Sequence, residues 1–473
     1  MSRILATAAL LLAGFSAQAA PSAGEARFRD LFKELVETDT SLSNGSCTLA
    51  AERMAARLRA AGLPDSDLHL FAEPDHPKEG GLVAVFPGRD PRSKAILLLA
   101  HLDVVEAKRE DWTRDPFKLV EENGNFYARG VADDKEQAAI WVDLLIRYRE
   151  EGYRPARTIK VALTCGEESA ARSFNGARWL AENQRDLIDA EFAINEGGGG
   201  ELDSAGRRLT HDVEAGQKTY QDFHIEITNP GGHSSVPRDD NAIYQLAGAL
   251  KRIEAYRFPT QLIDATRAYF AGMAKIQRAK GEVATADAME RLIRSPNDEE
   301  AAKLVSSKDA GWNSMLRTTC VATLLEAGHA ANALPQRARA NVNCRIFPGV
   351  SRESVQAKLQ ELVAEPAATV TMEAGGGPVR PPPPLPKKIL APVQSLTEQF
   401  WPGVPTIPFL LQGASDSLFL DAVGIPTYGI EPIFLGPDFG NVHGLNEYVG
   451  VQSLMEGREF LYRLVKIYAD QGS

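Results

Sequence analysis

The chain has 473 residues, of which 44% are hydrophobic and 24% charged, a composition typical of globular proteins. This length predicts about two or three domains. The formal net charge is −11, and because binding to phosphate backbones requires a basic surface, we expect no nucleic-acid partner.

The N-terminus has the pattern of a secretory signal peptide. Arg3 precedes the apolar stretch at residues 4–15, and Ala17-Gln18-Ala19 supplies the small residues of a cleavage site, which places the signal at residues 1–20. A membrane anchor is the alternative, but the apolar stretch is shorter than the roughly 20 residues that a span needs. We expect a soluble exported protein without membrane association after cleavage, most simply in a bacterial periplasm.

Up to residue 195, segments of helical periodicity alternate with short apolar runs that Gly and Pro separate. The expected helices cover residues 26–36, 46–61, 137–149 and 176–183. The expected strands cover residues 81–86, 95–100, 158–164 and 192–195. This alternation predicts an α/β catalytic domain, with its first part at residues 21–214, built on a mostly parallel sheet that helices cover on both faces.

The pattern changes after about residue 214. Residues 219–228 alternate between polar and apolar side chains, as in a half-exposed antiparallel strand. A helix at 241–255 and strands at 322–327 and 338–347 complete an inserted α+β domain at residues 215–376, with a charged helical segment near 260–315. A Pro-rich linker at 375–386 then returns to the second part of the catalytic domain, residues 377–473, whose last helix covers 453–470.

Four cysteines, Cys47, Cys165, Cys320 and Cys344, are few for an exported protein and do not have zinc-site spacing. Cys320 and Cys344 can pair if their strands are neighbours, whereas buried free thiols fit the sequence equally well. The sequence leaves the disulfide pairing open.

Acidic residues and histidines stand where the expected strands end. They are His101, Asp103, Asp133, Glu167, Glu168, Glu196 and His443. In a parallel sheet, functional groups collect beyond the carboxyl ends of the strands. Imidazoles and carboxylates at one such edge are what a pair of divalent metal ions requires, because carboxylates add charge and can bridge two ions.

Each cluster alone has an ordinary structural explanation. A single histidine is commonly structural, Asp133-Asp134 before a helix is commonly an N-cap, and Glu167-Glu168 fits a solvated loop. Asp103, two residues after His101, suits the role of a carboxylate that orients a ligand imidazole. Together and in this order, the clusters predict a two-metal hydrolase.

The order of these motifs resembles metallopeptidase family 20, which includes glutamate carboxypeptidase, aminoacylase, carnosinase-type dipeptidases and carboxypeptidase S. The matching segments are residues 100–103, 129–135, 166–168, 195–198, 231–235 and His443. Residues 111–117 and the helical segment near 260–315 place the resemblance closest to the carboxypeptidase S-like branch. The resemblance implies a zinc-exopeptidase catalytic domain with an inserted dimerisation or lid domain.

The resemblance also implies a role for each motif residue. One zinc ion is held by His101, Asp133 and Glu196, and the other by His443, Asp133 and Glu168; cobalt or manganese fits the same ligands. Asp103 orients His101, Glu167 is the general base, and His233 steadies the oxyanion, in the family often across a dimer interface. Arg345, Asn332 and Gly413 match substrate-binding positions.

Three positions are compared with the family pattern. Glu136 stands where the family usually has Gly, Gly166 stands where it commonly has Asp, and Glu196 stands at a ligand position that varies between Asp and Glu. None of these departures removes a ligand. We therefore expect an exported zinc-dependent hydrolase that cleaves the amide bonds of dipeptides or peptide C-termini.

The sequence leaves three alternatives open. An N-acyl-amino-acid hydrolase of the aminoacylase kind would use the same residues. A peptide-binding protein without activity is a further alternative, although such a protein has no use for Glu167. A homodimer and a self-sufficient monomer both fit, because the helical segment near 260–315 could cover the pairing surface of the inserted domain.

Overall fold

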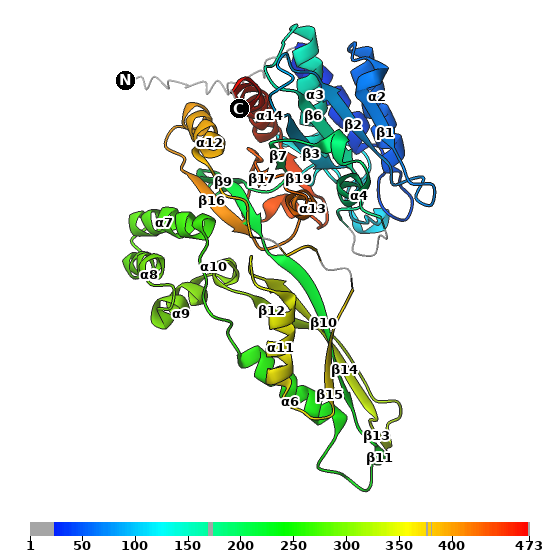
Figure 1. The fold of residues 1–473 in the computed structure, drawn as a ribbon, viewed down its shortest axis with the longest axis vertical. Helices are drawn as coiled ribbons and strands as arrows, with labels where there is room; N and C mark the ends of the chain where they lie inside the picture. Colours follow the sequence, from blue (N-terminus) through cyan, green and yellow to red (C-terminus); the bar gives the residue numbers. More distant parts are fainter. Residues whose placement is uncertain (1–22, 169–173, 375–376, 380, 472–473) are drawn as a thin grey trace, which may run out of the picture.

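The computed structural model of the 473-residue chain describes residues 23–168, 174–374, 377–379 and 381–471. The predicted signal peptide lies outside the described residues, as does part of the predicted linker at 375–386. No helix in the described part of the chain is long and apolar enough to cross a membrane. Figure 1 shows a broad α/β part joined to an elongated arm with a second sheet.

The main sheet contains ten strands among the described residues. In spatial order they are β1 (Leu68–Phe71), β2 (Gly81–Phe86), β6 (Ile159–Thr164), β3 (Ile96–His101), β7 (Phe192–Asn195), β17 (Thr427–Gly429), β9 (Arg208–Gln217), β8 (Gly199–Leu202) and β18 (Phe434–Leu435), and β16 (Thr406–Leu411) also pairs with β9. The centre from β6 to β17 is parallel, and antiparallel pairs flank it. The predicted α/β class with a mostly parallel sheet is confirmed.

Helices cover both faces of this sheet, because its central strands bury alternate side chains on opposite sides. In β3, Ile96 and Leu98 belong to one core, and Leu97 and Leu99 belong to another. The first core is covered by α1 (Ala23–Val36), α2 (Cys47–Ala60), α3 (Lys135–Glu150), α12 (Lys387–Phe400) and α14 (Val451–Asp470). The second is covered by α4 (Gly176–Asn183), α5 (Arg185–Ile188) and α13 (Ser417–Ala422).

A small antiparallel sheet lies at the edge of this part and brings two distant loops together. Its strands are β4 (Val120–Glu122), β5 (Asn125–Tyr127) and β19 (Tyr448–Gly450), in the order β19–β5–β4. Tyr448 pairs with Tyr127. Since β5 leads into the turn before Asp133 and β19 follows His443 closely, this pairing draws these two residues toward each other.

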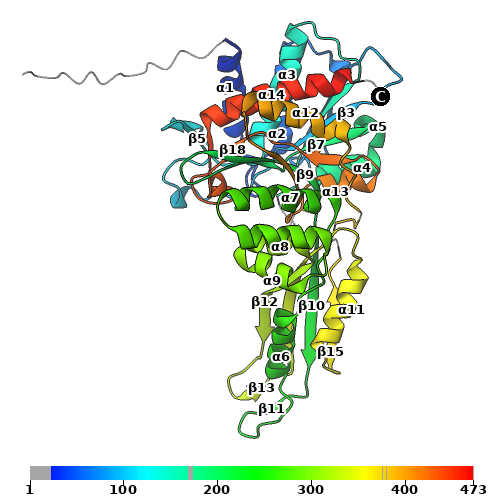
Figure 2. The same cartoon turned by 90° about the vertical axis from the view of Figure 1, so that its left-hand side faces the viewer.

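The arm, which we call the lid, contains a four-stranded antiparallel sheet with helices on one face (Figures 1 and 2). Its strands, in the order β12–β14–β10–β15, are β12 (Thr319–Ala327), β14 (Arg337–Ile346), β10 (Thr219–Thr228) and β15 (Ala368–Met372). The helices α6 (Ala242–Ala255) and α11 (Arg352–Val363) pack on its apolar face. The two-stranded ribbon of β11 (Gly232–His233) and β13 (Ala333–Leu334) forms the lid tip, the end farthest from the main sheet.

Four helices lie between the lid and the main sheet, where the sequence indicates a helical segment. They are α7 (Asp264–Ala279), α8 (Val283–Arg294), α9 (Glu299–Lys308) and α10 (Ala310–Leu316). They share a core with β16, in which Phe270 and Met289 meet Ile407. This segment therefore packs against the catalytic part as well as belonging to the inserted stretch of sequence.

Lys218 joins β9 to β10 and is fully buried. Its Nζ donates hydrogen bonds of 2.9–3.1 Å to the carbonyl and hydroxyl oxygens of Ser314, the carbonyl of Arg317 and the hydroxyl of Thr319. Burial lowers the pKa of Lys218 to about 7. These bonds tie the start of the lid to the helical segment.

All four cysteines are paired. Cys320 and Cys344, opposite each other on β12 and β14, form one disulfide, which resolves the pairing that the sequence left open. Cys47 and Cys165 form a second disulfide, which the sequence does not predict because 118 positions separate the two residues.

Candidate two-metal site

The predicted site residues converge because parallel strands end at one edge. His101 is the last residue of β3 and pairs with Thr164, the last residue of β6. The Glu167-Glu168 pair follows β6, and Glu196 follows β7, which also pairs with β3. The turn before α3 and the loop before β19 approach the same edge, so all five predicted metal ligands meet there.

His101 is held on both of its ring nitrogens. Its Nδ1 donates a hydrogen bond of 3.0 Å to the backbone carbonyl of Asp103. Its Nε2 lies 3.0 Å from Asp133 Oδ1 and 3.7 Å from Glu196 Oε2. The imidazole is almost fully buried, so its orientation is set before any ligand arrives.

Asp133 lies between the two histidines. One carboxylate oxygen is 3.0 Å from His101 Nε2, and the other is 3.1 Å from His443 Nε2. The same nitrogen of His443 is 2.8 Å from Glu168 Oε2. A carboxylate with one oxygen directed at each imidazole has the geometry of a ligand that bridges two ions.

The remaining carboxylates complete two overlapping groups around His101. Potential ligand atoms of His101, Glu167 and Glu196 all lie within 4.8 Å of one another. The same holds for His101, Asp133 and Glu168. The predicted base therefore lies in the same cluster as the predicted ligands.

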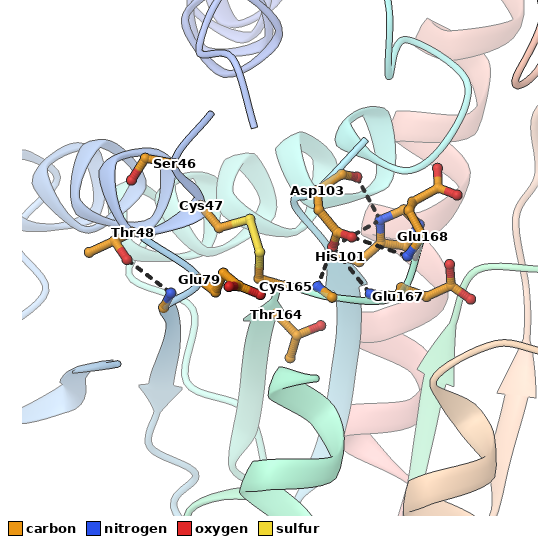
Figure 3. The surroundings of a disulfide bond; sticks show 12 residues. Ser46, Cys47, Thr48, Glu79, His101, Asp103, Thr164, Cys165, Glu167 and Glu168 are labelled. Carbon is orange, nitrogen blue, oxygen red and sulfur yellow. Dashed lines mark hydrogen bonds and ion pairs between the residues drawn. A yellow bond between two sulfur atoms is a disulfide. The ribbon is translucent and has the colours of Figure 1, made fainter. Parts of the chain in front are cut away.

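The Asp103 side chain holds the loop after β6 rather than the His101 ring. Its Oδ1 is 3.8 Å from His101 Nδ1, too far for a hydrogen bond. The carboxylate instead accepts N–H bonds from Gly166 at 2.7 Å, Glu168 at 3.1 Å and Glu167 at 3.4 Å (Figure 3). Asp103 thus orients the His101 ring with its backbone carbonyl, and it orients the main chain of Glu167 and Glu168 with its carboxylate. The predicted role of Asp103 is refined accordingly.

The pKa shifts in the cluster indicate that its carboxylates outnumber its positively charged groups. Burial opposes a charge on His101, but Glu196 and Asp133 outweigh it and raise its pKa well above the usual value. Hydrogen bonds to Asp133 and Glu168 raise the pKa of His443 to about 10. Burial, with the charge of Glu196, raises the pKa of Glu167 well above its usual range. Divalent cations bound at the cluster would balance these carboxylates.

The lid residues predicted for the oxyanion and the substrate do not join this cluster. His233 and Asn332 lie together at the lid tip, where the Ser234 N–H donates to the Asn332 carbonyl at 3.0 Å. Figure 1 places this tip at the opposite end of the molecule from β3. Arg345 lies at the hinge end of β14, with its guanidinium 4.8 Å from the centre of the Tyr220 ring.

Gly413 begins a loop that does reach the catalytic edge. In this loop, Asp416 accepts hydrogen bonds from Asn175 at 2.7 Å and from Thr164 at 3.2 Å. Asn195, directly before Glu196, donates to the Ser417 hydroxyl at 3.1 Å. Gly413 therefore belongs to a segment that packs against the strand ends beside the cluster.

A family model described as "Peptidase family M20/M25/M40" matches residues 97–467. The chain belongs to this family. It is a hydrolase of the metal-dependent M20 peptidase family, as the motif order predicts, and it has carboxypeptidase S-like relatives.

The human N-fatty-acyl-amino acid synthase/hydrolase PM20D1 is 26% identical over 388 residues, which cover 80% of this chain and 75% of the relative. The probable carboxypeptidase S-like 2 of Dictyostelium discoideum is 25% identical over 394 residues, covering 81% and 74%.

Solved structures of M20 enzymes have the same fold. The M20 family metallo-carboxypeptidase Sso-CP2 of Sulfolobus solfataricus aligns with a TM-score of 0.68 and 17% identity, over 93% of this chain and 99% of the other. Human carnosine dipeptidase 1 aligns with a TM-score of 0.62 and 15% identity, over 94% and 96%.

The residues present fit the pair of divalent ions that M20 enzymes use. Among the described residues, the ion-pair partners of Asp133, Glu168 and Glu196 are histidines, so no fixed cation neutralises these acids. Glu196 Oε1 is also buried without a hydrogen-bond partner in the described part of the chain. Two imidazoles and three carboxylates form a mixed nitrogen and oxygen ligand set that zinc, cobalt and manganese accept.

A buried ion pair that the sequence does not predict supports the turn before Asp133. Arg129 Nη1 lies 2.5 Å from Glu447 Oε2, and the other Glu447 oxygen accepts the Ala132 N–H at 3.0 Å. Arg129 also donates to the Gly444 carbonyl at 2.8 Å, next to His443. Glu447 thus links the Asp133 turn to the His443 loop. The only signal in the sequence was an acidic residue four positions after His443.

Proposed function

We propose that this protein is an exported zinc-dependent hydrolase that cleaves the amide bond of dipeptides or peptide C-termini. The observation that carries the proposal is the position of Asp133, with one oxygen directed at His101 and the other at His443. The M20 membership and the metallo-carboxypeptidase and dipeptidase folds support this class of reaction.

The chain supplies the acid–base chemistry around the metals. Divalent cations bound at this cluster would provide positive charge that activates water and polarises the scissile carbonyl. Glu167 accepts the proton of the attacking water and passes it to the leaving amine, since its carboxylate lies in the same cluster as the proposed ligands. Asp103 fixes the main chain that carries the proposed base Glu167 and the proposed metal ligand Glu168, because its carboxylate accepts the backbone N–H groups of both residues.

Two lid residues have the chemistry to bind the substrate. Arg345 has no carboxylate within ion-pair distance among the described residues, and it suits a substrate carboxylate. His233 Nδ1 accepts hydrogen bonds from the Ser235 hydroxyl at 2.7 Å and the Ser235 N–H at 3.2 Å. This leaves the proton on Nε2, where it can be donated to an oxyanion.

Because His233 lies far from the cluster of its own chain, we propose that it serves the site of a second copy. The free edge of the lid sheet supports this dimer. On β12, Val321, Leu324 and Leu325 are 59%, 70% and 68% exposed, and the neighbouring α6 exposes Tyr244. Exposed apolar side chains on an unpaired edge strand are typical of a surface that pairs with another chain.

Export to an oxidising compartment is also part of the proposal. All four cysteines form disulfides, which persist outside the cytosol and are rare inside it. Together with the signal-peptide pattern at residues 1–20, this supports a periplasmic location. Cleavage of the signal in the mature protein is tested by N-terminal sequencing of material from that compartment.

The similarity to N-fatty-acyl-amino acid synthase/hydrolase PM20D1 favours one alternative, hydrolysis of N-acyl amino acids. Both substrate classes present an amide next to a free carboxylate. The deciding experiment is hydrolysis of dipeptides and N-acyl amino acids by the zinc-loaded protein, with and without a chelator. Chelator-sensitive cleavage of the dipeptides supports the proposal, and cleavage of acyl amino acids alone supports the alternative. A protein that holds two metals and cleaves neither class would support the peptide-binding alternative or a substrate outside this panel.

A further inference from the structure

The Cys47–Cys165 disulfide lies directly beside the proposed base. Both cysteines are buried, and Cys165 immediately precedes Gly166-Glu167-Glu168 (Figure 3). We propose that this disulfide positions the side chains of Glu167 and Glu168, so that full catalytic rate requires the bond to be oxidised. The inference rests on the proposed function and assigns a role to two residues outside the metal ligands.

The Cys47 end of the bond is firmly anchored. Cys47 is the first residue of α2, and the side chain of the N-cap Ser46 accepts the Leu49 N–H at 3.2 Å. On the other side of Cys47, the Thr48 hydroxyl donates to the Pro77 carbonyl at 2.7 Å and accepts the Gly80 N–H at 2.9 Å. Because both neighbours of Cys47 are fixed, the sulfur of this residue is a rigid point of attachment.

The Cys165 end leads into a segment with little freedom to shift. The Cys165 carbonyl accepts the Gly176 N–H at 2.7 Å. Gly166 has a φ of +100°, and a Cβ there would lie 2.3 Å from the Phe174 carbonyl oxygen, so the chain passes in close contact with its neighbour. The loop is therefore fixed covalently at residue 165 and by hydrogen bonds to the Asp103 carboxylate at residues 166–168.

These two attachments are not equivalent. The hydrogen bonds to Asp103 hold the loop only while the N–H groups of residues 166–168 stay opposite that carboxylate. The disulfide fixes residue 165 from outside the site and so keeps these N–H groups in position. Reduction adds two electrons and two protons and leaves two thiols that no longer constrain residue 165. A displacement of about 1 Å at a catalytic group can cost about 100-fold in rate. We expect the loss to appear in kcat, because the proposed substrate-binding residue Arg345 lies elsewhere.

The test compares two disulfide deletions. In Cys47→Ala/Cys165→Ala, we expect kcat to fall by at least about tenfold with KM within about twofold of wild type. In the matched control Cys320→Ala/Cys344→Ala, which removes the lid disulfide, kcat should stay within about twofold of wild type. The visible absorption spectrum of the Co²⁺-substituted protein should change only in the first variant, because Glu168 is a proposed ligand. Wild-type kcat and spectrum in the first variant would overturn the proposal.

A second measurement keeps the proposal testable if the first variant does not fold. The Cys320→Ala/Cys344→Ala chain is made in a reducing compartment and then oxidised with glutathione disulfide, which accepts the two electrons and protons of the thiols. We expect kcat to rise by at least about tenfold as the two remaining thiols disappear. An unchanged kcat across oxidation contradicts the proposal. If the oxidised wild-type protein hydrolyses nothing, the proposed function fails, and the Co²⁺ spectra of the two redox forms still test the positioning role.

Discussion

The catalytic edge and the lid tip differ in how much of their site one chain supplies. At the edge, five predicted ligands and the predicted base converge from five separate segments. At the tip, His233 and Asn332 lie on neighbouring strands of the ribbon and belong to none of the candidate metal-binding groups found among the described residues. We therefore propose that one chain supplies the metal ligands, whereas the oxyanion donor His233 acts in the site of a second copy.

The largest expected effect is at the edge. Glu167→Gln should lower kcat by about 10⁴-fold while both metals stay bound, because the amide cannot accept a proton and Glu167 is not a proposed ligand. Steady-state kinetics and metal analysis of the purified variant measure the two quantities. A metal-replete Glu167→Gln protein with substantial activity would exclude Glu167 as the base.

A smaller loss is expected at the tip. His233→Ala should lower kcat by about 10²-fold, because it removes one oxyanion donor. If His233 acts in the partner's site, a 1:1 mixture of His233→Ala and Glu167→Gln chains should recover about a quarter of wild-type activity after subunit exchange, since half of the dimers are mixed and each has one intact site. No recovery in a mixture shown to have exchanged would place His233 outside the partner's site.

The proposed contact between copies can be broken without changing either proposed site. Leu324→Asp/Leu325→Asp puts two charges on the exposed edge of β12 and should give a monomer with a rate close to that of His233→Ala. Sedimentation velocity and kinetics on the same sample provide the check. The matched control is Val283→Asp, an exposed apolar residue on α8 outside that edge. A fully active monomeric double variant would contradict the shared site.

The smallest expected effect concerns acid stability, which differs between the two parts. The catalytic part buries His211 among the rings of Trp401, Phe434 and Phe460. Burial lowers its pKa to about 3, against about 6.5 in the unfolded chain. Above pH 6.5 it is neutral in both states. Between pH 6.5 and 3 only the unfolded chain binds the proton, so stability falls as the pH falls through this window.

From pH 7 to pH 5, His211 should thus cost about 2 kcal/mol of unfolding free energy. Denaturant unfolding of wild type and His211→Gln at both pH values measures this, with the other titrating groups common to both proteins. An equal loss in the two proteins would show that His211 does not carry the effect.

The hydrophobic periodicity of the sequence predicted most of the fold, because it depends only on residues that are close together in the chain. The strands β2, β7 and β10 have the bounds that the apolar runs indicated. The convergence of His101 and Glu196 followed from the rule that parallel strands end together. Distant pairings were not predictable, since neither Cys47–Cys165 nor Arg129–Glu447 leaves a trace in nearby residues.

The role of Asp103 was predicted only in part. Its place two residues after His101 suggested a contact between the two side chains, but the carboxylate turns toward the next loop and leaves the backbone carbonyl for the ring. The position of His233 was equally beyond the sequence, because it depends on the angle between the lid and the main sheet rather than on any local motif.

The hydrogen bonds of Lys218 fix the end of the lid that lies nearest the main sheet. A small rotation about this residue would therefore move the lid tip by a large distance. The ten residues of β10 extend about 33 Å from that lysine toward the tip. A rotation of 10° at residue 218 therefore carries the tip ribbon through about 6 Å, while Arg345 near the pivot hardly moves. Opening and closing of this arm would thus change the distance of His233 from the reacting group and leave the Arg345 guanidinium almost in place.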